Sequence, residues 1–320
     1  YHVWGTECVR QLIGDFCFAI WDKQNKTLFC ARDNFGVKPF FYAIAGNTIV
    51  FSNTFDCIRK HPDISQEFND QAIADFLLFG FGLDLDSTAF TSIKRLPPAH
   101  IISWKTADAK PVQYWSLPDG GRIRYRRPTE YIDHFKHLLR EAVEDRLRTD
   151  QISVEMSGGL DSTAIAATAN AILKNTGRPF ELRAYNSVID NLFSDEERAY
   201  SVQAAQKIGI PIEHIVVDNH PLFSGADDRK ILTPEPLDTP YTAVTKDYYN
   251  KASNQFRVAL NGQGADEILA DDCLVDLFGK MNIKDLLLGI LCSITQYHQR
   301  PAFCLRSKLI KFSKKKPPYE

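Results

Sequence analysis

The decisive stretch of this chain is ISVEMSGGLDST, residues 152–163. A run rich in β-branched residues ends in paired glycines, and an alanine-rich helical pattern follows them. Paired glycines let backbone N–H groups approach an anion, and the first turn of the helix adds unpaired N–H donors and the positive end of its dipole. An acid at Asp161 would repel phosphate oxygens unless a cation lay between them. The stretch therefore predicts a site for a nucleotide with Mg2+.

A simpler interpretation stays open for this stretch taken alone. It could be an ordinary strand-to-helix turn in which the helix dipole favours the acid. The chain has no Walker loop ending in Gly-Lys-Ser/Thr, and no Gly-x-Gly-x-x-Gly followed by a ribose-binding acid.

Composition indicates a globular enzyme with more than one domain. The chain has 320 residues, 44% of them hydrophobic and 24% charged, against a prior of about 150 residues per domain. The net charge of −2 gives no sign of nucleic-acid binding. The basic run Lys308–Lys316 is more typical of a solvated tail.

Cysteine spacing and hydropathy bear on the compartment. The seven cysteines lack the C-x-x-C spacing of zinc sites and the density of a disulfide framework, which favours buried thiols in a reducing compartment. Neither a signal peptide nor an apolar stretch of about 20 residues is present. We therefore expect a cytoplasmic protein that binds no membrane.

The first part of the chain is rich in predicted antiparallel strands. Alternating apolar residues around polar and Gly-Asn turns predict two hairpins, then a helix and a further strand. The hairpins pair 16–22 with 27–32 and 39–43 with 48–52; the helix is 70–79 and the strand 100–104. We assign residues 1–117 to this domain and 118–128, with Pro118, paired glycines and a run of arginines, to a linker.

The second domain, residues 129–320, follows an alternating pattern of helices and strands. Helices are predicted at 129–148, 162–174 and 195–208, and strands at 152–156, 182–188 and 212–217. This alternation is typical of an α/β domain whose parallel sheet carries helices on both faces.

A second glycine loop points to the same edge of that sheet. Residues 256–260 form a predicted strand that runs directly into NGQGADE, residues 261–267. Ligands bind outside the carboxyl ends of parallel strands, so both loops face one crevice. Asp161 and Asp266 could then hold the same Mg2+. Taken alone, the second loop could also be a helix N-terminus with favourable acids.

These motifs resemble those of a known family. Residues 157–163 look like the pyrophosphate loop of the ATP-pyrophosphatase superfamily. Residues 12–22 and 31–42 are similar to the later half of a class II glutamine amidotransferase domain, and 157–162 with 262–267 to the ATP motifs of the glutamine-dependent asparagine synthetases. The resemblance implies an antiparallel, partial Ntn-type domain followed by an adenine nucleotide alpha hydrolase-like domain.

The resemblance also implies a mechanism and a set of site residues. A carboxylate attacks the α phosphate of ATP, and ammonia or another amine then displaces AMP. Asp161, Asp266 and Gln263 are implied in catalysis, the two aspartates as Mg2+ ligands. Implied nucleotide contacts are Met156, Ser157, Gly158, Gly159, Leu160, Asp161, Ser162, Ser187, Asn261 and Gly262. Contacts with the base and ribose are implied near Glu155 and Met156, around Tyr185 to Val188, and at Asn261 and Gly262. Aspartate with glutamine or ammonia, or a precursor peptide, would be the substrates, and a homodimer is a candidate assembly.

Several departures from the family pattern leave alternatives open. The family's glutaminase uses an N-terminal cysteine, whereas this chain begins at Tyr1 in mid-domain and ends at Glu320 soon after the second motif, which suggests a fragment. Gln263 replaces a glutamate, and 268–272 lack the usual glycine pair. Since glutamine accepts no proton at neutral pH, a lasso-peptide cyclase-like or β-lactam synthetase-like ligase is one alternative. A non-catalytic homologue is another.

Overall fold

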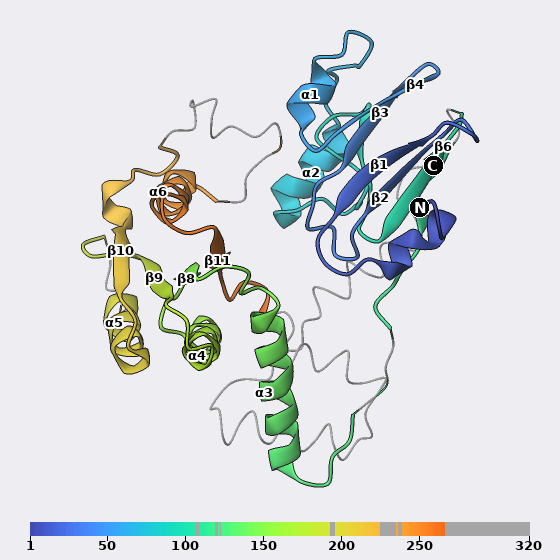
Figure 1. The fold of residues 1–320 in the computed structure, drawn as a ribbon. Coiled ribbons are helices and arrows are strands. Elements are labelled where there is room, and N and C mark those ends of the chain that lie inside the picture. The colour runs from blue at the N-terminus through green and yellow to red at the C-terminus, as the bar shows by residue number, and fades with distance from the viewer. Residues whose placement is uncertain are drawn as a thin grey trace, which may run out of the picture. The chain divides into compact units, whose positions relative to one another are not determined.

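The computed structural model describes residues 1–106, 109–118, 121, 123–192, 196–224, 235 and 239–265. The chain divides into two compact units, one of residues 1–132 with 217–249 and the other of residues 133–216 with 250–320. Each unit has its own sheets and its own core (Figure 1). Asp266 and the basic run Lys308–Lys316 lie outside the described residues.

The first unit contains two antiparallel sheets, as predicted. One has the strand order β1-β2-β6-β7 and the other β4-β3-β5. Both predicted hairpins are confirmed, and the short edge strands β5 and β7 were not predicted. The strands are β1 (Cys17–Asp22), β2 (Thr27–Arg32), β3 (Phe41–Ala45), β4 (Thr48–Ser52), β5 (Ile93–Arg95), β6 (His100–Trp104) and β7 (Val112–Gln113).

The first unit also contains the helical segments η1 (Gly5–Gln11), α1 (Phe55–Arg59) and α2 (Asp70–Phe79). The sequence predicts α2 with the same bounds, because both of its ends carry signals. The Asn69 side chain accepts a hydrogen bond from the Ala72 amide at 3.3 Å, and Gly80 takes the left-handed conformation, with φ of +79°.

Two buried charged residues, Arg32 and Asp33, stand at the start of the turn that links β2 to β3. The Asp33 carboxylate accepts hydrogen bonds from the backbone amides of Phe35, Val37 and Lys38. The Arg32 guanidinium donates to three backbone carbonyls, those of Gly36, Lys38 and Leu96. Arg32 and Asp33 therefore hold this turn in place, and their charged groups are already saturated with backbone partners.

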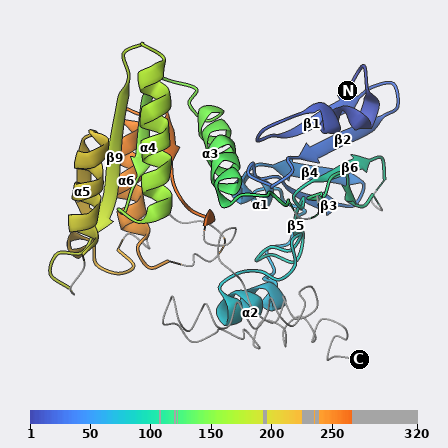
Figure 2. The same ribbon diagram turned by 90° about the horizontal axis from the view of Figure 1, so that it is seen from below.

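The second unit is built on a parallel sheet, which confirms the α/β prediction. Its strand order is β10-β9-β8-β11. The strands are β8 (Gln151–Glu155), β9 (Glu181–Val188), β10 (Ile212–Val216) and β11 (Val258–Leu260). Helices α4 (Leu160–Asn175) and α5 (Glu197–Ile208) pack on one face of the sheet (Figures 1 and 2). The segment η2 (Val217–Asn219) follows β10.

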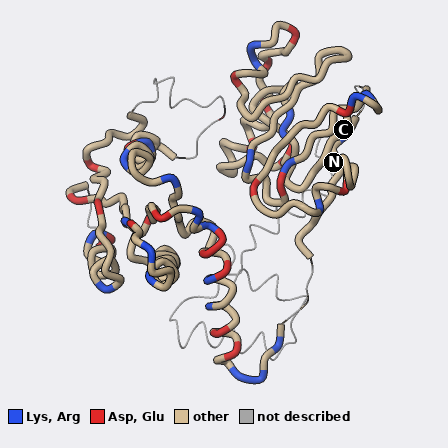
Figure 3. Tube along the Cα trace, in the orientation of Figure 1, with Lys and Arg blue, Asp and Glu red and all other residues tan. Residues whose placement is uncertain are grey.

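Two helices, α3 (Pro128–Glu144) and α6 (Thr242–Ser253), cross the division between the units. Acidic and basic residues both occur along α3 (Figure 3), and two pairs one helical turn apart lie close together. They are His137 with Glu141 at 3.5 Å and Arg140 with Glu144 at 3.8 Å. Helix α3 ends before the predicted residue 148, because the Arg146 and Leu147 amides bond to carbonyls three residues back and tighten the chain into a turn.

The core of the second unit follows the alternation of the strands. Ile152, Val154 and Met156 point to the face that α4 covers, where they pack with Ala166 and Ala169. The small alanines let α4 approach the sheet closely. Among the described residues, no helix is both long and apolar enough to cross a membrane.

Candidate active site

The turn after β8 depends on a glycine at position 158. Gly158 has a φ of +92°, a conformation that side chains rarely adopt. A Cβ there would also lie 2.6 Å from both the Ser201 amide nitrogen and the Tyr200 carbonyl carbon of α5. Glycine is thus required both for the turn and for its packing against α5.

The turn places the hydroxyl groups of Ser157 and Ser162 and the N-terminus of α4 at the edge of the sheet. Gly159 is the N-cap of α4, and its amide donates to Ser157 Oγ at 3.3 Å. Ser157 Oγ lies 3.4 Å from Ser162 Oγ, and Asp161 occupies the first helical turn. Two hydroxyls, free N–H donors and a carboxylate therefore share this edge.

The loop after β11 packs directly on this helix start. A Cβ at Gly262 would lie 3.1 Å from the Ser162 amide nitrogen and 3.4 Å from Asp161 Cβ. Asn261 Oδ1 accepts a hydrogen bond from the Gln263 amide at 3.2 Å, which orders the start of the loop. Since β11 pairs with β8 in parallel, both loops leave the carboxyl end of the same sheet, as predicted.

The two loops border one cavity of about 430 Å³. Acidic side chains among the described lining residues are Glu155, Asp161 and Glu197, and none of these lining residues is lysine or arginine. Desolvation raises the pKa of Glu155 above its ordinary value. The other lining residues are Ser157, Gly159, Ser162, Asn186, Ser187, Asn261, Gly262 and Gln263.

The structure brings most of the predicted site residues to this cavity and places three of them elsewhere. Gly158 lies against α5, and the Met156 side chain is completely buried in the core. Leu160 is 90% exposed. Of these three residues, only the backbone groups could therefore make the predicted contacts with a nucleotide. The predicted metal ligand Asp266 lies outside the described residues.

Residues of the cavity suit a nucleotide phosphate with a cation. The backbone at the N-terminus of α4 forms a turn that suits an anion. A Cβ atom at Gly158 or Gly262 would crowd neighbouring atoms and disturb that turn. Among the described residues no group of three or more Asp, Glu, His or Cys could hold a metal ion. Asp161 would supply one carboxylate ligand there, a pattern that suits Mg2+ when substrate phosphates and water complete the shell.

Two further residues line the cavity. Asn186 falls within residues 185–188, where the resemblance implies contacts with the base and ribose, whereas Glu197 was not predicted. Asn186 lies near the end of β9, the strand next to β8, and Glu197 lies in the first turn of α5. Their positions at the carboxyl end of a parallel strand and at the following helix start were the available signal.

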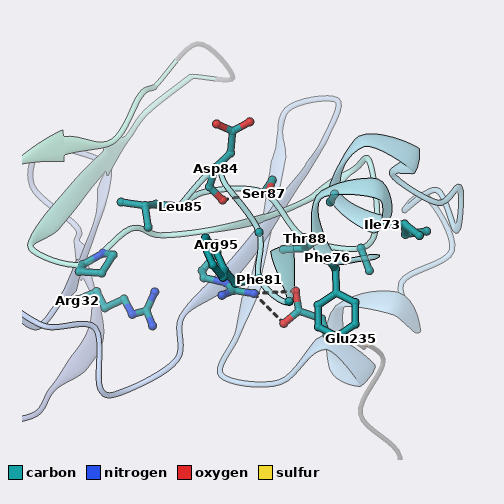
Figure 4. A pocket seen from close by; sticks show the side chains of 15 residues that line it. Arg32, Ile73, Phe76, Phe81, Asp84, Leu85, Ser87, Thr88, Arg95 and Glu235 are labelled. Atoms are coloured by element: carbon teal, nitrogen blue, oxygen red, sulfur yellow. Dashed lines mark hydrogen bonds and ion pairs between the residues drawn. The ribbon is translucent and has the colours of Figure 1, made fainter. Parts of the chain in front are cut away.

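A second cavity, of about 350 Å³, lies in the first unit (Figure 4). Its apolar wall comes from α2 and the segment after it, including Phe76, Phe81 and Leu85. Arg95 Nη2 lies 2.6 and 2.7 Å from the two carboxylate oxygens of Glu235. Desolvation raises the pKa of Glu235, and the attraction of Arg95 opposes that rise.

Comparisons with known proteins agree with this two-part organisation. Residues 1–115 match the family model of the glutamine amidotransferase domain, and residues 134–271 match that of asparagine synthase. The glutamine-hydrolysing asparagine synthetase 2 of Bacillus subtilis is 28% identical over 292 residues, which are 83% of this chain and 37% of that protein. Asparagine synthetase 3 of the same organism is 26% identical over 286 residues, 84% of this chain and 45% of that protein.

The chain thus spans less than half the length of these curated relatives. Among solved structures, it is similar to the NH3-dependent NAD synthetase from Campylobacter jejuni at 11% identity and a TM-score of 0.29, over 61% of this chain and 99% of that one. The chain therefore carries, in succession, a region that matches the glutamine amidotransferase domain and a region that matches asparagine synthase, and its listed relatives include glutamine-hydrolysing asparagine synthetases.

Proposed function

We propose that this protein is an ATP-dependent amide ligase that activates a carboxylate as an acyl-adenylate and transfers ammonia from glutamine to it. One observation carries the proposal. The glycine turn after β8 and the loop after β11 pack against each other through Gly262 and Ser162, so that their polar groups line one cavity. A turn with free N–H donors beside a carboxylate suits the triphosphate of ATP.

In the first step, a substrate carboxylate oxygen bonds to the α phosphorus, and the bond from that phosphorus to the bridging oxygen breaks. Ser157 and Ser162 hydroxyls and the N–H groups at the start of α4 hold the oxygens of the departing pyrophosphate, where negative charge increases. Asp161 would hold Mg2+, which supplies further positive charge to the leaving group.

In the second step, the nitrogen of ammonia attacks the acyl carbon, AMP leaves with the C–O bond electrons, and the nitrogen loses a proton. The match of residues 1–115 to a glutamine amidotransferase domain favours glutamine as the source of ammonia. The relatives' names favour aspartate as the carboxylate and asparagine as the product.

ATP–pyrophosphate exchange tests the activation step directly. We expect exchange that depends on aspartate, and the Asp161→Asn variant should lower its rate by about 100-fold or more because one cation ligand is lost. Asp145→Asn, an exposed position beyond the cavity, is the matched control and should exchange normally.

Exchange that requires a carboxylate other than aspartate would reject the assignment to asparagine and leave the ligase. Absence of exchange with every carboxylate, together with full cellular function of Asp161→Asn, would instead identify a homologue without turnover.

Gln263 favours a second candidate in which the attacking amine differs. Its side chain lies at the cavity, and an amide cannot take a proton from ammonia at neutral pH. A ligase resembling lasso-peptide cyclases or β-lactam synthetases would use an amine of its own substrate. Cyclisation of a precursor peptide without glutamine would support this candidate, whereas strict dependence on glutamine or free ammonia would reject it.

A further inference from the structure

The second cavity, in the first unit, has an apolar wall that is open to solvent. Phe76, Phe81 and Leu85 line it, and Phe81 and Leu85 are 61% and 66% exposed. Isolated exposed apolar residues are ordinary on protein surfaces, but these border a single cavity that also contains two arginines. Its volume of about 350 Å³ falls within the range of small-molecule sites, roughly 300–1,000 Å³. The wall therefore suits a small molecule with an apolar part.

Arg32 and Arg95 give this cavity an excess of positive charge. Desolvation, and then the charge of Arg95, lower the pKa of Arg32, which is only 8% exposed. Asp33 opposes that shift, but its carboxylate is held by backbone amides and does not line the cavity. The acids among the described lining residues are Glu235 and Asp84, and Figure 4 shows the Asp84 carboxylate directed away from both guanidinium groups. Two guanidinium groups therefore accompany one carboxylate inside the cavity.

Arg95 has a donor that its neighbours leave unused. Its Cζ lies 5.5 Å from the centre of the Phe41 ring, and its Nη2 donates to the Glu235 carboxylate. Its Nε is buried and has no hydrogen-bond partner among the described residues. A buried donor without a partner is costly, so an orphan N–H on a residue that lines a cavity indicates a bond that a ligand completes.

The hydroxyl groups of the cavity are already engaged. Ser87 Oγ donates to the Asp84 carbonyl at 3.1 Å, and Thr88 Oγ1 donates to the Ile93 carbonyl at 2.7 Å. The side-chain donors left for a ligand are therefore those of the arginines. Hydrogen bonds between charged donors and anions are roughly twice as strong as neutral ones, so these donors favour an anion.

We propose that the second cavity binds a small carboxylate with an apolar body. The carboxylate would lie between Arg32 and Arg95 and accept a bond from Arg95 Nε, and the apolar body would cover Phe81 and Leu85. A carboxylate brings the one negative charge that the cavity lacks, and its two oxygens match a planar guanidinium. A phosphate monoester brings close to two charges, which exceeds the balance. The two cavities share none of their described lining residues, so this ligand is distinct from the carboxylate that the proposed ligase activates.

A set of matched probes tests the charge and the apolar body separately. Isothermal titration compares 3-phenylpropionate with 3-phenylpropanamide, which has the same shape without the charge, and with acetate, which has the charge without the ring. The parent protein should bind 3-phenylpropionate about 10-fold more tightly than either of the others. Arg95→Met should bind 3-phenylpropionate and its amide equally weakly, because the charge of the ligand then has no partner at Nε.

Two further variants separate this contact from structural damage. Arg59→Met removes another arginine that lies over an aromatic ring, with its Cζ 4.5 Å from the centre of the Phe90 ring, at a position that does not line the cavity. It should keep the preference for 3-phenylpropionate. Glu235→Gln removes the carboxylate that shares Arg95 and should bind 3-phenylpropionate about 3-fold more tightly than the parent protein. A damaged fold cannot produce such a gain.

Several outcomes would overturn this inference. They are no binding of 3-phenylpropionate by the parent protein, equal binding of its amide, and unchanged preference in Arg95→Met. Loss of the preference in Arg59→Met as well would assign the effect to the stability of the unit. Tighter binding of L-glutamine than of 3-phenylpropionate would reject the apolar body and indicate a site for the amide donor. Because no nucleotide enters this titration, its result is independent of the proposed function.

Discussion

The sequence predicts those site residues whose type is required by the backbone conformation of the turn or by the bound anion. The glycine pair and the acid at 161 follow from the needs of a phosphate site, and the structure adds a second demand at Gly158, which packs on Tyr200 and Ser201. The strand pattern indicates the position of Asn186 near the end of β9, but it gives no information on the side-chain amide. Only the assembled sheet and cavity show that Asn186 is buried at the cavity and that its Nδ2 has no hydrogen-bond partner among the described residues.

Gly158→Ala tests both requirements at this position, the left-handed backbone conformation and the close packing against α5. A left-handed φ alone costs an alanine about 1 kcal/mol, and a Cβ 2.6 Å from backbone atoms of α5 must also displace that helix. We expect the variant to lose about 2–4 kcal/mol of unfolding free energy in urea denaturation and to bind ATP poorly.

Gly177→Ala is the matched control for that variant. Gly177 has a φ of +66°, and a Cβ there would meet nothing within 4 Å. It should therefore show only the cost of backbone strain. Equal losses in the two variants would contradict the proposed packing role of Gly158.

At the scale of elements, periodicity and end signals predicted most of the fold. The bounds predicted for α2 agree with the structure, in which Asn69 caps its start and Gly80 ends it. Helix α3 was predicted too long, because nothing in its sequence marks Glu144 as the last helical residue. The short strands β5 and β7 were missed, since three or two residues show no alternation and their pairing depends on distant strands.

The contact between α5 and β10 should make the stability of the second unit decrease at acidic pH. His214 Nε2 lies 3.1 Å from the hydroxyl of buried Ser201. Desolvation, and then the charge of Arg198, lower the pKa of His214 below its ordinary value of 6.5. A lowered pKa means that the folded state disfavours the proton. Its contribution to stability is therefore present above about pH 6.5 and is lost as the pH falls through the folded-state pKa.

Melting temperatures at pH 7.5 and pH 5.5 measure this effect. We expect His214→Gln to lose less stability than the parent protein on acidification, since it has no imidazole to protonate. His2→Gln, at an exposed position, should leave the pH dependence as in the parent protein. An unchanged pH dependence in His214→Gln would reject this role of the histidine.

At the scale of the whole molecule, the chain order does not show which segments assemble. Residues 217–249 group with residues 1–132 in one compact unit, and Glu235 pairs with Arg95, which precedes it by 140 residues. Strand and helix patterns are local, so they predict the contents of each sheet and carry no information on such a distant ion pair. The sequence therefore predicted that the two glycine loops lie at the carboxyl ends of β8 and β11, but it gave no indication of this long-range contact.

The Arg95–Glu235 pair should be measurably coupled. The side chains are 32% and 27% exposed, between the surface pairs that contribute little and the buried pairs that are costly to break. In a double-mutant cycle of Arg95→Met and Glu235→Leu, we expect a coupling of about 1–2 kcal/mol in unfolding free energy at pH 7.5.

The pH dependence of Arg95→Met separates an ion pair from simple packing. Desolvation raises the pKa of Glu235, and Arg95 opposes that rise, so removing Arg95 leaves a carboxylate whose protonated form the fold prefers. A raised pKa contributes stability at low pH that is lost as the pH rises through the folded-state value. Arg95→Met should therefore recover part of its lost stability between pH 7.5 and pH 5, relative to the parent protein. Arg95→Met combined with Glu235→Leu should show no such recovery, and recovery of the same size in both variants would assign the effect to groups other than Glu235.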